Sequence, residues 1–363
     1  MSKLAVNANT LWLYAVLVHI AGSIVVNVMT ALPFGSVILM TGIWAGLFLA
    51  LNKNRKYMIP LGAGWVLSIF ILFNIPPSYE GSFLLNGFIV VLVFYVCQSR
   101  ETDPVEFCHI KKIPVKQWGL IFLLSIGLII IAGYVNGISM LAFYNGTVNS
   151  LQEVGKYFPE SLIVLALVPA LSEEMLFRGC IYQEISGMDK KGKAVFLSAI
   201  LFALLHMNFN QMSYAFVMGL FFGFLVLVTD NLSVSMLIHA IFNCFNVFIY
   251  AFPDHFMIKA IMNIHVGSYY LFNPVLRDGT GAILQDALIV GAIITLCMLI
   301  FVGALLYILS KWSRQEHIET GNIGKKQKIE ENTLSLWKPD REFWAGCILC
   351  LAYAGLYELF MHG

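Results

Sequence analysis

The sequence predicts an all-α protein that crosses a membrane many times, and two observations support this fold class. Of its 363 residues, 59% are hydrophobic and only 12% are charged, and the mean hydropathy is +0.79. A soluble domain needs many more charged residues on its surface. The chain also contains about eleven apolar runs long enough, or nearly so, to cross the hydrocarbon core of a bilayer, which takes about 20 helical residues. We therefore predict a polytopic transmembrane helical bundle of about eleven helices.

The spans can be justified in chain order. The first run is too long for the hydrophobic region of a cleaved signal peptide and lacks a convincing small-residue cleavage site, so it is interpreted as a helix that stays in the membrane. The runs 35–51, 57–75 and 193–207 are short or merge with their neighbours, so the number of crossings could differ from eleven by one or two. In order, the predicted spans are 9–31, 35–51, 57–75, 83–98, 117–136, 160–182, 193–207, 212–229, 234–251, 284–310 and 342–360.

Lys and Arg residues collect in alternate connections, as the positive-inside rule requires of a multispanning protein. With the N-terminus in the cytosol, eighteen of the 22 lie in cytosolic segments, three lie outside, and Arg178 lies within a span. This distribution predicts a cytosolic N-terminus and a C-terminus outside. The outer residues are Lys156, Lys259 and Arg277; the cytosolic ones are Lys3, Lys53, Arg55, Lys56, Arg100, Lys111, Lys112, Lys116, Lys190, Lys191, Lys193, Lys311, Arg314, Lys325, Lys326, Lys328, Lys338 and Arg341.

The connections divide the chain into three parts. Residues 1–116 form a first set of transmembrane helices, 117–251 a core, and 252–363 an outer loop followed by C-terminal helices and a cytosolic loop. In the outer connections, residues 137–159 are expected to form an interfacial amphipathic helix, and 252–283 to fold over the membrane surface. The net charge is about +1, which shows no basic excess that would indicate nucleic acid as a partner.

One span contains a group of charged residues. A charged side chain at the bilayer centre costs about 2.5–3.5 kcal/mol on insertion scales, so such residues normally face a cavity or a partner. On a helix, Glu174 and Arg178 share a face and can pair, whereas Glu173 points about 100° away and has no cation on that helix. The pattern predicts one neutralised glutamate and one neighbour free to exchange a proton, as a general base must be.

Several residues near these charges have structural interpretations. Pro169 is expected to kink or interrupt the helix, and Ser172 to cap the segment that restarts after it. The Gly219-x-x-x-Gly223 spacing is typical of close packing between helices of the same bundle. His19 lies within the first span without a partner motif, so it is interpreted as a structural residue.

Two further pairs repeat the spacing of one helical turn: Phe202 with His206, and His239 with Asn243. Their predicted depths in the membrane allow the polar members to meet Glu173. Counted from the cytosolic helix ends at about 1.5 Å per residue, Glu173, His206, His239 and Asn243 lie roughly 15, 19, 9 and 15 Å deep. All four can therefore line one polar pocket that opens to the cytosolic half of the membrane.

Together the three motifs, Glu173-Glu174-x-x-x-Arg178, Phe202-x-x-x-His206 and His239-x-x-x-Asn243, resemble those of the CAAX protease and bacteriocin-processing (CPBP) family of intramembrane endopeptidases, also called the abortive-infection family. The resemblance covers residues 117–251. It implies an endopeptidase in which Glu173 activates a water molecule for attack on a peptide carbonyl, helped by His206, with Phe202 in contact with the substrate.

The resemblance also implies roles for the other motif residues. Glu174 and Arg178 would shape the site, and His239 and Asn243 would stabilise the oxyanion with preorganised hydrogen-bond donors. No cofactor is expected. Glu173, His206 and His239 are also possible zinc ligands, but the chain lacks the H-E-x-x-H motif that places two His ligands and a base on one helix.

Two other classes of function remain open. An ion-coupled transporter would use the same charged residues as a relay, although two related halves would then be expected. A non-catalytic immunity or scaffold protein would keep its function without Glu173. The expected partners are the lipid bilayer and a peptide or protein substrate, and the candidates include a prenylated CAAX tail, a small peptide precursor, a membrane protein and a signal peptide. The expected location is a bacterial plasma membrane.

Overall fold

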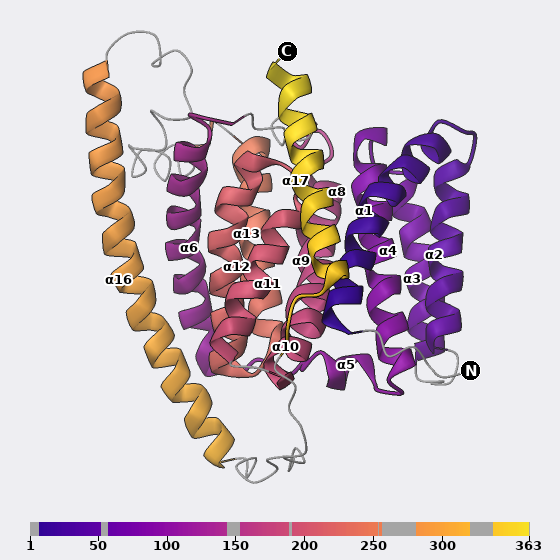
Figure 1. The fold of residues 1–363 in the computed structure, drawn as a ribbon, viewed down its shortest axis with the longest axis horizontal. Coiled ribbons are helices and arrows are strands. Elements are labelled where there is room, and N and C mark those ends of the chain that lie inside the picture. Colours follow the sequence, from indigo (N-terminus) through magenta and orange to yellow (C-terminus); the bar gives the residue numbers. More distant parts are fainter. Residues whose placement is uncertain are drawn as a thin grey trace.

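The computed structural model describes residues 7–51, 57–143, 153–188, 191–252, 254–255, 281–319 and 337–362. Over these residues the chain forms helices and no β-strand, which confirms the predicted all-α class. The helices run up and down in a bundle (Figure 1). Before the central polar span, they are α1 (Ala8–Thr30), α2 (Gly35–Leu51), α3 (Met58–Leu72), α4 (Pro77–Ser99), the short α5 (Pro104–Phe107), η2 (Val115–Gln117) and α6 (Trp118–Ser139).

The second half of the chain begins with a composite helix made of five consecutive elements, and single helices follow it. The composite helix contains α8 (Phe158–Ser161), η3 (Leu162–Leu167), α9 (Val168–Glu174), η4 (Met175–Ile181) and α10 (Tyr182–Met188). The later helices are α11 (Lys191–Leu205), α12 (Phe209–Thr229), α13 (Leu232–Ala251), α16 (Gly281–Glu319) and α17 (Arg341–His362).

Each of the eleven predicted spans coincides with one of these helices or with the composite helix. Seven helical segments in the described part of the chain are long and apolar enough to cross a membrane: Ala8–Thr30, Pro77–Ser99, Val115–Ser139, Phe209–Thr229, Leu232–Ala251, Leu288–Gln315 and Arg341–Phe360. The helices α2 and α3 are apolar but shorter, with 17 and 15 residues. The chain is therefore an integral membrane protein.

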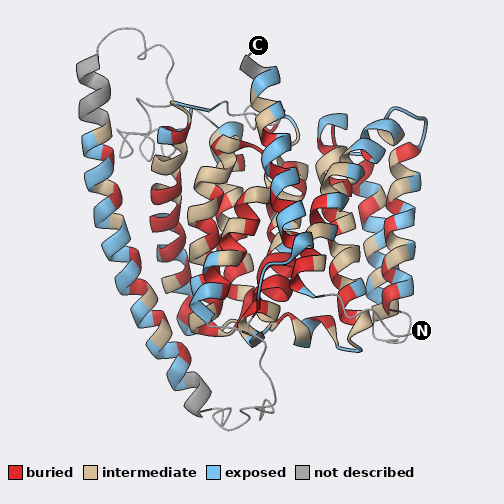
Figure 2. Ribbon diagram, viewed as in Figure 1, coloured by how far each residue is buried: buried red, intermediate tan, exposed pale blue. Residues whose placement is uncertain are grey.

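Buried and exposed residues are distributed as expected for a helical bundle in lipid (Figure 2). Burial is greatest in the central helices, and α16 exposes large apolar side chains such as Leu296 and Ile300 along its length. Apolar side chains facing outward are favourable when the solvent is a hydrocarbon. The described cysteines are all unpaired thiols; five of the seven are buried, Cys244 is half-buried, and Cys297 on α16 is exposed.

The connections that carry the predicted positive charges lie at one end of the bundle. In Figure 1 the short α5 and the end of α16 lie at the lower end, and α17 begins nearer mid-height. A hydrogen bond from Lys111 joins the turn between α12 and α13 to the α5 region. Among the described Lys and Arg residues outside the spans, only Lys156 belongs to the opposite end. Residues 144–152 of the outer segment 137–159 and most of the segment 252–283 lie outside the described residues, so the interfacial helix and the surface loop stay predictions.

The lower end is fastened by hydrogen bonds between the α5 region and the α12–α13 turn. Asn231 is the N-cap of α13: its side chain accepts from the backbone N–H of Ser233 at 3.0 Å and of Lys111 at 3.2 Å. Asp230 accepts from Lys111 at 2.6 Å and contacts His109 Nδ1 at 2.7 Å. These contacts fix where α13, which carries His239, begins.

The composite helix alternates α-helical and π-helical turns around the charged residues. Pro169 lies in the first turn of α9, directly after the π-helical segment η3. The chain continues as a helix through this point, so the change of helical type replaces the predicted interruption. The predicted cap is wrong: the Ser172 hydroxyl lies 3.0 Å from the carbonyl oxygen of Val168 and also contacts the side-chain carbonyl of Asn86 on α4. π-helical turns occur often at functional sites.

Helices α11 and α12 pack closely through the two glycines that the spacing predicted. A Cβ atom on Gly219 would lie 2.9 Å from the Cα of Ala199, and one on Gly223 would lie 2.9 Å from a methyl group of Val195. Both distances are too short for a real Cβ atom. The glycines therefore bring the backbone of α12 next to α11 at the depth of the charged residues.

Candidate active site

Glu174 and Arg178 form the ion pair that their spacing predicts. Arg178 Nη1 donates to Glu174 Oε1 at 2.8 Å, and both side chains are completely buried. The second terminal nitrogen of Arg178 donates to the backbone carbonyl of Gly219 on α12 at 2.9 Å. A buried charge needs such partners, because removing either member of a buried pair leaves an uncompensated charge.

Aromatic rings surround the guanidinium of Arg178. Its central carbon lies 4.4 Å from the ring centroid of Phe202, 5.2 Å from that of Phe222 and 5.9 Å from that of Phe177. Cation–π attraction at desolvated sites is worth about 2 kcal/mol. Phe202 has only 2% of its surface exposed. In this structure it therefore packs inside the site, and its predicted contact with a substrate stays a prediction.

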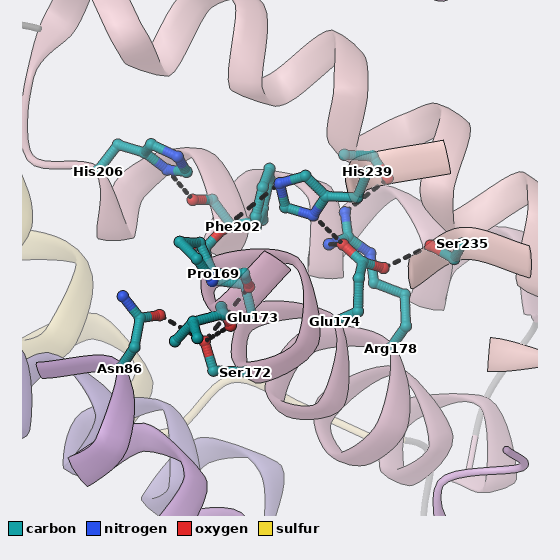
Figure 3. Close-up of polar contacts among 12 residues, drawn as sticks. Asn86, Pro169, Ser172, Glu173, Glu174, Arg178, Phe202, His206, Ser235 and His239 are labelled. Atoms are coloured by element: carbon teal, nitrogen blue, oxygen red, sulfur yellow. Dashed lines mark hydrogen bonds and ion pairs between the residues drawn. The ribbon is translucent and has the colours of Figure 1, made fainter. Parts of the chain in front are cut away.

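Glu174 also connects the composite helix to α13. Its Oε1 lies 3.1 Å from His239 Nδ1, and its Oε2 accepts from the hydroxyl of Ser235. Figure 3 shows the carboxylate of Glu174 surrounded by Arg178, Ser235 and His239. An ionised carboxylate can only accept hydrogen bonds, so in the contact between Glu174 and His239 the hydrogen lies on Nδ1 of His239. His239 also stacks on Phe222, with the ring centroids 4.7 Å apart.

Glu173 lies outside this pair, as the sequence predicts. Its side chain keeps 20% of its surface accessible, whereas Glu174 keeps none. His239 Nε2 lies 3.9 Å from Glu173 Oε2. That distance is too long for a hydrogen bond but short enough for both atoms to contact one oxygen atom placed between them. Glu173 is therefore the accessible carboxylate of the cluster.

His206 lies at the end of α11 with a defined ring orientation. Its Nδ1 is 2.8 Å from the backbone carbonyl of Phe202, and its ring packs edge-on against the Phe202 ring at 4.9 Å. A carbonyl only accepts hydrogen bonds, so Nδ1 carries the hydrogen. In the neutral ring, Nε2 is then left with a free lone pair that can accept a hydrogen bond from water.

The structure therefore joins most of the seven predicted residues through direct contacts. Glu174, Arg178 and His239 are hydrogen-bonded, Glu173 faces His239, and Phe202 contacts Arg178, His206 and His239. Asn243 is half-buried one turn after His239, and no hydrogen bond connects it to the other six among the described residues. Its predicted oxyanion role stays a prediction.

The sequence interpretation missed three residues that support the cluster: Ser235, Phe222 and Asn86. Ser235 precedes His239 by one helical turn, so a search for polar residues on that face would have found it. Phe222 and Asn86 belong to other helices and gave no local signal. In the described residues, no group of three or more His, Cys, Asp or Glu side chains is arranged to hold a metal ion, and a metal-free site stays a prediction.

The fold and this cluster define a class: an integral membrane protein with a charged, hydrogen-bonded site inside its helical bundle. Residues 157–245 match the family model of the Type II CAAX prenyl endopeptidase Rce1-like proteins. This segment includes all seven predicted site residues and is narrower than the predicted core, 117–251.

A curated relative is similar over a longer stretch. The chain is 26% identical over 203 residues to the membrane-embedded CAAX protease MroQ of Staphylococcus aureus (strain USA300), an alignment that covers 53% of this chain and 80% of the relative. No solved structure matches the chain. The family model and the relative confirm the resemblance to the CPBP family, and at the level of the family they support an intramembrane protease.

Proposed function

We propose that this protein is an intramembrane endopeptidase in which Glu173 activates the water molecule that hydrolyses a peptide bond. The observation that carries the proposal is the division of labour between the two adjacent glutamates. Glu174 is completely buried and engaged by Arg178, Ser235 and His239, whereas Glu173 is partly accessible and receives no hydrogen bond from a cation among the described residues. A general base must be able to contact water and accept a proton, and of the two only Glu173 has that freedom.

In the proposed reaction, Glu173 accepts a proton from water while the water oxygen attacks the scissile carbonyl carbon. The tautomer of His206 supports a helping role, because the free lone pair on its Nε2 can hold the second hydrogen of the same water. Cleavage of the C–N bond then returns a proton to the leaving amine. A metal ion is not required for these steps.

His239 and Asn243 are proposed to stabilise the oxyanion. His239 can take this role only when its imidazole is doubly protonated, because its Nδ1 hydrogen already points to Glu174. Only a ring that carries hydrogens on both nitrogens can also donate from Nε2 toward the developing negative charge. Glu174 would balance that positive charge from the opposite side of the ring, while Arg178 holds Glu174 in place.

The site is proposed to work from the cytosolic half of a bacterial plasma membrane, with the N-terminus of the chain in the cytosol and the C-terminus outside. The concentration of Lys and Arg residues at one end of the bundle supports this orientation. The substrate is proposed to be a peptide or protein, either lipidated or embedded in the membrane. A prenylated CAAX tail is one candidate, because the family model and the relative carry that name.

The test compares new peptide termini, by mass spectrometry, in membranes that carry wild-type protein or Glu173→Gln at matched expression. Glu173→Gln keeps the size and polarity of the side chain, so the protein should keep its wild-type Tm and lose proteolysis. Termini that disappear with the variant would support the proposal and identify the substrate. If no terminus depends on Glu173 while the chain's cellular effect persists, the protein is a non-catalytic scaffold.

A further inference from the structure

His19, on a helix outside the segment that matches the family model, has an unusual environment. It continues the buried face of α1 after Trp12 and Val16, which are both completely buried. Packing is looser further along α1. His19 is half-buried, none of residues 17–25 is buried, and the next buried residue is Val26. The buried face of α1 is therefore tightly packed at its start and open in its middle.

One nitrogen of the His19 ring lacks a partner. Nδ1 is inaccessible to solvent and makes no hydrogen bond with any described residue. Leaving a buried polar atom unsatisfied is unfavourable, and such atoms are rare in native proteins. A purely structural histidine would be expected to use both ring nitrogens or to be replaced by an apolar residue. An unpartnered nitrogen at this position is available to a partner that the described residues do not supply.

His19 belongs to the same region as the catalytic cluster. Helix α1 packs against η4, which contains Arg178, and against α11, whose end positions His206. The imidazoles of His19 and His206 are close enough to interact electrostatically. The hydrogen bonds that other helices make with Glu174 and Arg178 come from α12 and α13, so none of them comes from α1.

We propose that His19 is a substrate-binding residue: as the peptide enters, the imidazole ring turns, and its free Nδ1 hydrogen-bonds the main chain of the peptide beside the scissile bond. This inference rests on the proposed peptidase function. An extended peptide inside a membrane protein brings unpaired N–H and C=O groups into a place with little water, where each needs a partner. An unpaired imidazole nitrogen, which donates or accepts according to its tautomer, meets this need. His19 therefore extends the site from the motif helices to α1.

The test uses a synthetic peptide that spans a Glu173-dependent cleavage site, with purified full-length protein in lipid nanodiscs. The Kd of the uncleaved peptide is measured by fluorescence anisotropy in the Glu173→Gln background, with and without His19→Leu. Loss of one hydrogen bond should weaken binding about tenfold, which corresponds to about 1.4 kcal/mol. With Glu173 intact, KM for the same peptide should rise by a similar factor and kcat should change less.

Two further variants separate binding from packing. The amide of an Asn lies close to the position of Nδ1, so His19→Asn should bind the peptide nearly as well as the wild type, and Ser23→Ala, one turn further along α1, should be neutral. Replacing an unsatisfied polar group with Leu should keep or raise Tm. A wild-type Kd for His19→Leu would overturn the inference, and so would a fall in Tm, which would mark His19 as structural. If no terminus depends on Glu173, the peptidase proposal fails and this inference fails with it.

Discussion

The buried pair of Glu174 and Arg178 gives a quantitative test of how the site is held together. We consider Arg178→Met, because Met fills much of the volume of Arg without its charge. The substitution removes the 2.8 Å contact to Glu174, the 2.9 Å hydrogen bond to Gly219 and the cation–π contact with Phe202. It also leaves the carboxylate of Glu174 buried without a cation, for which the expected loss of stability is about 3–5 kcal/mol.

The assay is thermal unfolding of purified protein in nanodiscs, followed by tryptophan fluorescence. At about 2 °C per kcal/mol for a chain of this size, Arg178→Met should lower Tm by roughly 6–10 °C. The matched control is the double variant Glu174→Gln with Arg178→Met, in which no unpaired charge remains. It should recover most of the loss, because a buried ion pair replaced as a whole is often close to neutral. An unchanged Tm for the single variant, or equal losses in both, would refute the pairing argument.

Three further predictions concern the packing, the lower end and the orientation of the bundle. Gly219→Ala should push α12 away from α11 and lower both Tm and proteolysis. The control is Gly303→Ala on α16, where an added Cβ atom would have no neighbour within 4 Å and should leave both unchanged. Equal effects of the two variants would disprove the close packing. Burial disfavours ionised Asp230, but hydrogen bonds from His109 and Lys111 outweigh it and hold its pKa well below the usual range. A lowered folded-state pKa stabilises the protein above the unfolded value of about 3.9, so the Tm advantage of the wild type over Asp230→Asn should be present at neutral pH and decline below about pH 4; an advantage that persisted in acid would contradict this. Alkaline phosphatase is active only outside the cytosol, so its fusion to the C-terminus should be active in cells. If that fusion were inactive and a green fluorescent protein fused at the same position were fluorescent, the C-terminus would lie in the cytosol and the proposed orientation would be wrong.

The positions of the transmembrane helices were predictable because the signal is local and strong. About 20 consecutive apolar residues suffice to mark a helix that crosses a bilayer, whatever that helix later packs against. The same holds for contacts one turn apart on one helix, such as the pair of Glu174 and Arg178, since helical geometry alone brings them together. Close packing of α12 within the bundle also followed from a local spacing, that of Gly219 and Gly223, but the spacing did not identify α11 as the neighbour.

Contacts between helices could be decided only by the tertiary structure. The positions of Ser235 against Glu174, Phe222 against His239 and Asn86 against Ser172 depend on how α13, α12 and α4 approach the composite helix, and nothing local in the chain encodes those approaches. For this reason Ser172 was mistaken for a cap. The sequence by itself determined where the apolar helices lie and which side chains are the candidates for the chemistry. Their packing determined which glutamate is held by Arg178 and which stays accessible, because burial and hydrogen-bond partners are supplied by neighbouring helices.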